Sequence, residues 1–102
     1  EHVIASAAQV QATGVRFVCP LKVSVDFYLP RPKSMPARIL LHAKRPDLDK
    51  LVRGAIDALT NVLWKDDSQV VILRAVKRYT DGNDAPRAEF TIQPLNEDEV
   101  IV

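Results

Sequence analysis

Apolar and polar residues alternate without interruption along Leu21–Leu29. Alternation with a period of two puts the two sets of side chains on opposite faces of a β-strand, so the segment predicts a strand with one buried and one wet face. A similar alternation from Ala88 ends at Pro94 and predicts another strand. Gln69–Tyr79 is apolar on both sides of the pattern, which is typical of a strand that is central in its sheet or faces a second subunit. The polar segment Asp81–Pro86 predicts a hairpin turn between these last two strands.

Two other segments repeat with the helical period. Along Leu48–Val62, apolar residues recur three and four positions apart, which predicts an amphipathic helix. Asp47 is placed to cap the start of this helix with its carboxylate, and Asn61 is a plausible end. Glu1–Ala12 is rich in alanine and carries an apolar stripe, so it predicts a further helix that Gly14 closes.

Length and composition narrow the class of protein. The chain has 102 residues, of which 47% are hydrophobic and 26% charged, as in globular domains and unlike disordered tails. We therefore expect one α+β domain over residues 1–102, with a small, mostly antiparallel sheet and helices packed on one side. The sequence does not begin with methionine, so we expect the domain to lack its extreme N-terminus. One cysteine allows no internal disulfide and no apolar run is long enough to span a bilayer, so we expect a cytoplasmic protein.

Positive charge is unevenly distributed, although the formal net charge is only +1. A loop punctuated by prolines and rich in basic residues follows the first alternating strand and leads into the amphipathic helix. The candidates for contact with a DNA backbone are Arg31, Lys33, Arg38, Lys44, Arg45 and Lys50. A solvated surface loop would explain the same charges. The position of the loop, directly before an acidic pair, favours contact with DNA.

Acidic residues stand at both ends of the amphipathic segment. Asp47 and Asp49 flank its first residue, and Asp66 and Asp67 follow its end. Each has an ordinary explanation as a helix cap, a solvated acid or part of a polar turn. If they came together, their like charges would require a cation, and carboxylate oxygens suit Mg²⁺, with Mn²⁺ as a possible substitute. Such an ion stabilises charge on a phosphodiester and lowers the pKa of an attacking water.

The string DLDKLVRGAIDALTNVLWKDDSQVV, residues 47–71, resembles the signature of the RusA family of Holliday-junction resolvases. That signature consists of D-L-D-N-L, a helix containing D-A-L, an aromatic residue, D-D-x-Q-V-V and a strand with a lysine. The matching residues are Asp47–Leu51, Asp57–Leu59, Trp64, Asp66–Val71 and Lys77. The resemblance is close in the C-terminal part of the chain and loose in the strand before it.

The resemblance implies a homodimeric, Mg²⁺-dependent endonuclease that resolves four-way DNA junctions by paired nicks in DNA recombination and repair. It maps the essential metal-binding carboxylates onto Asp47, Asp49 and Asp67. Arg53 stands at the position of a basic residue that matters in the family and is usually lysine. Arginine is a poorer proton donor, so its expected role is electrostatic stabilisation of the transition state. Lys77 matches the lysine of the strand and is expected either to assist the chemistry or to form a salt bridge with the acids after the helix.

Two other functions fit the same residues. A protein that kept the surface but lost cleavage would bind branched DNA without cutting it. A metal nuclease with a different preference would cut flap or replication-fork DNA. Metal-dependent cleavage would exclude the first alternative, and a panel of substrates would separate the second from a resolvase.

Overall fold

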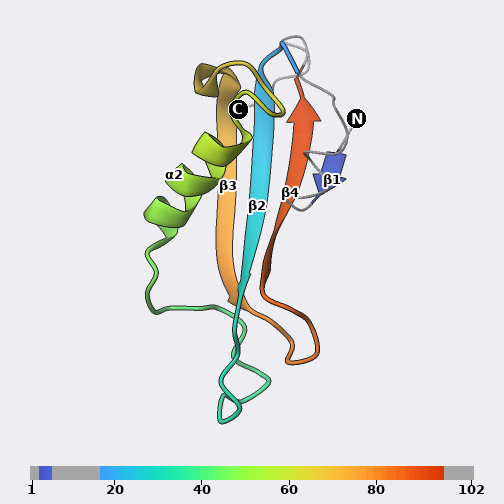
Figure 1. Cartoon of the computed structure of the whole chain (residues 1–102). Coiled ribbons are helices and arrows are strands. Elements are labelled where there is room, and N and C mark those ends of the chain that lie inside the picture. The colour runs from blue at the N-terminus through green and yellow to red at the C-terminus, as the bar shows by residue number, and fades with distance from the viewer. Residues whose placement is uncertain (1–2, 6–16, 96–102) are drawn as a thin grey trace.

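The computed structural model describes residues 3–5 and 17–95 (Figure 1). The elements in these residues are β1 (Val3–Ala5), β2 (Leu21–Leu29), α2 (Leu48–Leu59), the 3-10 turn η1 (Asp67–Gln69), β3 (Val70–Tyr79) and β4 (Arg87–Pro94). The α+β class predicted from the sequence is confirmed. Within the described residues, no helix has the length and apolarity needed to cross a bilayer.

The sheet is mixed, with the strand order β1-β4-β2-β3. β2 runs parallel to β3 and antiparallel to β4, and β1 runs antiparallel to β4. The hairpin predicted at Asp81–Pro86 is therefore wrong, because β2 lies between the two strands that this segment connects. The reason is the helix between β2 and β3. A crossover helix of this kind returns the chain for parallel pairing on one edge of β2 and leaves the other edge for β4.

β3 is an edge strand, so the central position predicted for it is wrong, and the alternative, a strand that faces a second subunit, stays a prediction. Its mixed pattern has two causes. One face is only partly covered, since Leu73 on the core side is 46% exposed, and a register shift leaves Val71 without a partner, since Leu21 pairs with Val70 and Lys22 with Ile72. Val71 is 56% exposed as a result.

The core lies between α2 and one face of the sheet. The residues of β2 that are buried in it alternate along the strand as predicted; they are Leu21, Val23, Val25 and Phe27. The apolar stripe of α2 packs against this cluster, and Trp64, which is fully buried, closes it just after the helix. The side chains between the buried ones, from Lys22 to Tyr28, point to the opposite face, which carries no helix among the described residues.

The first predicted helix is wrong where the structure describes it. Val3–Ala5 pair as β1 with Phe90–Ile92 of β4. The β-branched Val3 and Ile4 favour a strand, and the edge of β4 supplies backbone partners. The rest of Glu1–Ala12 and Gly14 lie outside the described residues.

Candidate functional site

The start of α2 presents two exposed carboxylates. Asp47 is the N-cap residue, as predicted, but its side chain accepts no capping hydrogen bond. Within the described residues its carboxylate forms one ion pair, a long one of 3.9 Å from Oδ2 to the Nζ of Lys50, between two well-exposed side chains. Such pairs contribute little. Asp49 lies in the first turn and is also exposed. Both carboxylates are thus accessible to a ligand.

Lys77 reaches towards this end of α2 from β3. Its Nζ donates hydrogen bonds to the backbone oxygens of Lys44, at 2.5 Å, and Pro46, at 2.8 Å. It therefore fixes the backbone directly before Asp47. Among the ion pairs of the described residues, none joins Lys77 to Asp66 or Asp67, so that alternative is not the arrangement found here.

A hollow of about 530 Å³ opens beside Asp47. Arg45, Pro46 and Lys50 form the rest of its lining. Two of the basic residues predicted to contact DNA are thus brought beside a candidate metal ligand. Arg53 is exposed one helical turn after Asp49, a spacing that places two side chains on the same side of a helix.

Asp66 has a structural role at the other end of α2. Its carboxylate accepts a hydrogen bond from the backbone N–H of Ser68 at 2.9 Å, and the side chain of Gln69 accepts one from the backbone N–H of Asp66. The N–H of Ser68 is the main reason that the pKa of Asp66 lies below its ordinary value. Gln69 also donates to the backbone oxygens of Phe17 and Cys19, both at 3.1 Å. This capping box fixes the turn that carries Asp67.

Asp67 does not meet the other two acids within one chain. It follows the C-terminus of α2, whereas Asp47 and Asp49 lie at the N-terminus, and Figure 1 shows the helix running between these two places. The 12 residues of α2 give the helix a length of about 18 Å. Within residues 3–5 and 17–95, no three His, Cys, Asp or Glu side chains lie close enough together to hold a metal ion. One chain supplies two carboxylates, a set that fits Mg²⁺ when water and substrate phosphate complete its shell.

The basic loop is partly tied to the fold. Arg31 donates through Nε to the backbone oxygen of Thr80 at 2.6 Å and through a terminal nitrogen to Pro36 at 3.0 Å. Its guanidinium also lies 5.4 Å from the ring centre of Tyr79. Arg31 therefore holds the loop to the end of β3. Lys33, Arg38 and Lys44 are exposed and accessible to a partner.

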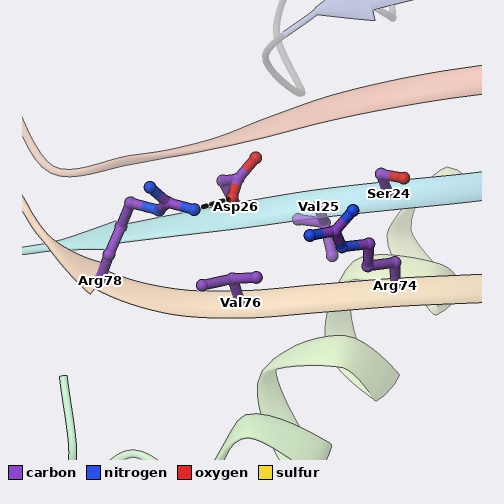
Figure 2. Close-up of a pocket in the computed structure, with 6 residues that line it drawn as sticks. All are labelled: Ser24, Val25, Asp26, Arg74, Val76 and Arg78. Atoms are coloured by element: carbon purple, nitrogen blue, oxygen red, sulfur yellow. Dashed lines mark hydrogen bonds and ion pairs between the residues drawn. The ribbon is translucent and has the colours of Figure 1, made fainter. Parts of the chain in front are cut away.

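The sequence reasoning missed a second polar cluster, on the sheet face away from α2 (Figure 2). Arg78 donates to Asp26 at 2.8 Å, and these residues lie beside Ser24, Arg74 and Val76 around a hollow of about 220 Å³. The alternation of Leu21–Leu29 predicts the polar face that carries Ser24 and Asp26, but the sequence does not show that β3 lies beside it.

Comparison with known proteins agrees with the resemblance. A family described as "Endodeoxyribonuclease RusA" matches residues 1–93. The chain is 34% identical over 87 residues to the uncharacterized protein YqaN of Bacillus subtilis (strain 168), which covers 76% of this chain and 59% of that protein.

The chain also resembles proteins named crossover junction endodeoxyribonuclease RusA. It is 36% identical over 78 residues to that of Escherichia coli (strain K12), which covers 74% of this chain and 53% of the relative. The figures for the protein of the same name from Shigella sonnei (strain Ss046) are identical. The chain spans somewhat more than half the length of the curated relatives it matches. Because the family match covers most of its residues, the chain belongs to the RusA endodeoxyribonuclease family.

Proposed function

We propose that this chain is a subunit of an Mg²⁺-dependent endonuclease that cuts two strands of a four-way DNA junction. The observation that carries the proposal is the pair of exposed carboxylates of Asp47 and Asp49 at the start of α2, with Asp47 beside Arg45 and Lys50, in a chain of this family. Mn²⁺ is a chemically reasonable substitute for the metal. The DNA substrate implies a role in recombination and repair inside a bacterial cell or a phage-infected host.

The residues around the acids have distinct proposed roles. A bound Mg²⁺ would stabilise the charge of the phosphodiester and lower the pKa of a water. Arg53 would contribute further positive charge to the transition state. Lys77 would hold Asp47 in place through the backbone before it. Contact with the DNA backbone is assigned to the exposed basic side chains Lys33, Arg38, Lys44, Arg45 and Lys50, with Arg31 shaping their loop.

We infer that the third acid comes from a second copy of the chain. Two α2 helices packed antiparallel would bring the η1 end of one copy beside the N-terminus of α2 in the other. Asp67 of one chain would then join Asp47 and Asp49 of its partner, and the two-fold axis would create two equivalent sites. Two sites match a substrate with two strands to cut.

The surface of α2 offers a place for this packing. A groove of about 350 Å³ runs along the helix and is almost entirely apolar; its lining is Phe27, Lys50, Leu51, Gly54, Ala55, Ala58, Leu59, Ala88 and Phe90. The small side chains at Gly54, Ala55 and Ala58 allow another helix to approach closely. A Cβ atom added at Gly54 would meet nothing within 4 Å in the single chain.

The first test is cleavage of a labelled four-way junction, with duplex and flap DNA as comparison substrates, in Mg²⁺ and in EDTA. We expect symmetric paired nicks in the junction, which EDTA abolishes. Junction binding without cleavage in Mg²⁺ would favour the non-catalytic alternative. Preferential cutting of the flap would favour the other nuclease.

A mixture of two inactive variants tests the shared site. Asp49→Asn and Asp67→Asn should each abolish cleavage, whereas Asp84→Asn, in the exposed loop after β3, should not. After subunit exchange, a dimer of one Asp49→Asn and one Asp67→Asn chain contains one intact and one doubly altered site. We expect the mixture to regain single nicks but not paired ones. If each site came from one chain, every site would carry a substitution and the mixture would remain inactive.

A further inference from the structure

The sheet face away from α2 carries positive charge that the proposed cleavage site does not use. Its cations are Lys22 on β2, Arg74 and Arg78 on β3, and Arg87 on β4. The register places them on one face, because Ser24 is opposite Arg74 and Tyr28 is opposite both Arg78 and Arg87, all at positions between the buried ones.

The acids of this face neutralise only half of these cations. Arg78 pairs with Asp26 at 2.8 Å, and Arg87 pairs with Glu89 at 2.7 Å. Lys22 and Arg74 have no ion pair within the part of the chain that the structure describes. The face therefore has surplus positive charge, and Arg74 holds it at an exposed position.

The arrangement of the arginines on this face suits an extended anion. Figure 2 shows the guanidinium of Arg74 near one end of the hollow and that of Arg78 beside Asp26, with Val76 between them. Tyr28 supports the row, since the guanidinium carbons of Arg78 and Arg87 lie 5.6 Å and 4.0 Å from its ring centre. Four residues along a strand correspond to about 13 Å, so Arg74 and Arg78 would reach different phosphates of a DNA strand.

We propose that this open face is a second contact surface for the phosphate backbone of DNA, centred on Arg74 and Lys22 and extended by Arg78. It would hold a DNA arm on the side of the sheet opposite the candidate cleavage site. The proposal deepens the proposed function, because a branched substrate has arms that can lie on two faces of one subunit. The surface itself requires neither metal nor cleavage.

The test is junction affinity in EDTA over a series of salt concentrations, for the parent protein, Arg74→Gln and the double variant Lys22→Gln/Arg74→Gln. Each phosphate contact contributes about 0.9 to the slope of log affinity against log salt. We expect the slope to fall by about 0.9 for the single variant and about 1.8 for the double variant, with an affinity loss of about eightfold per contact at 0.1 M salt. Lys65→Gln, an exposed lysine beyond α2, is the control for net charge and should leave the slope unchanged.

The outcomes separate this proposal from the proposed function. If the parent cuts junctions but Arg74→Gln keeps the parental slope, or if Lys65→Gln lowers it equally, the open face is not a DNA surface. If the slope falls as expected but no variant or parent cuts DNA, the surface stands and the nuclease assignment fails. Thermal melting of each variant excludes loss of fold as the cause.

Discussion

Lys77 is the residue that most directly links β3 to the candidate site. Its two hydrogen bonds end on backbone oxygens, so it acts on Asp47 through the chain that carries it. The alternative expected from the sequence was a salt bridge with Asp66 or Asp67. The contacts with the backbone make Lys77 a positioning residue in our proposal.

Lys77→Met should lower the cleavage rate more than the affinity for DNA. Small misplacements of reacting groups cost on the order of a hundredfold in rate, so we expect a fall of roughly ten- to a hundredfold in kcat. Junction affinity in EDTA should change less than about twofold, because the lysine is assigned no phosphate contact. Equal losses of rate and affinity would contradict this role and place Lys77 on the DNA.

Asp66 predicts a pH dependence of stability. Hydrogen bonds, first from the N–H of Ser68, hold the pKa of Asp66 below its ordinary value of 3.8. A carboxyl with a lowered pKa in the folded state stabilises the fold above its ordinary pKa, and this contribution is lost as the pH falls through the lower value. Asp66→Ala should therefore lower Tm at neutral pH, and the difference from the parent should shrink below pH 3.8. Asp66→Asn, which keeps an acceptor oxygen, is the matched control. A Tm difference that stays constant down to low pH would rule out the titration.

At the scale of elements, α2 contains a glycine whose replacement should stabilise the chain. Gly54 lies in the helix interior, and an added Cβ would meet no atom within 4 Å. Glycine is less favourable than alanine there by up to about 1 kcal/mol. Gly54→Ala should raise the free energy of unfolding by about that amount, measured by urea denaturation of dilute protein. A loss of stability would show that the added methyl group clashes with another part of the protein at this surface of the helix.

The end of α2 depends on Trp64. The indole is fully buried, and its Nε1 donates to the Thr60 hydroxyl at 3.0 Å. Removing such a side chain costs about 3–5 kcal/mol, a large share of the stability of a small domain. Trp64→Ala should therefore be largely unfolded by circular dichroism, whereas Trp64→Phe should fold with reduced Tm. A fully folded alanine variant would contradict this account of the core.

The elements themselves were largely predictable, and their pairing was not. β2 begins and ends where its alternation does, and α2 begins after Asp47 but ends at Leu59, before Asn61. Alternation shows which face a residue occupies but not which strand lies beside it. The sequence therefore could not show that β2 separates β3 from β4. The strand at Val3–Ala5 depends on an edge of β4 that is distant in sequence.

At the scale of the whole molecule, the family resemblance predicts which acids form the site but not their separation along α2. The spacing of the motif in the sequence does not show that a helix about 18 Å long separates Asp47 and Asp49 from Asp67 in the folded chain. In the proposed dimer, Asp67 of one copy lies beside Asp47 and Asp49 of the other copy. Because Asp67 lies apart from Asp47 and Asp49 in one chain, a site that uses all three acids would have to be shared between two copies.

The groove along α2 gives the direct test of the dimer. Ala58→Glu introduces a charge into an almost entirely apolar lining, and its burial against a second copy would be costly. We expect this variant to be monomeric by sedimentation and inactive in cleavage, while its Tm at low protein concentration matches that of the parent. Ala85→Glu, which adds the same charge at an exposed position of the loop before β4, is the matched control. A monomeric Ala58→Glu protein that still makes paired nicks would overturn the shared site.

The parallel pairing of β2 and β3 also bears on when such an enzyme can act. A helix that connects two parallel neighbours must start near one end of the strands and finish near the other end, so the acids that flank it are kept apart in the folded single chain. A lone subunit would then be harmless to DNA. The cutting rate at high dilution would rise with the square of the subunit concentration, and the amount of protein made would itself decide whether the chromosome is cut.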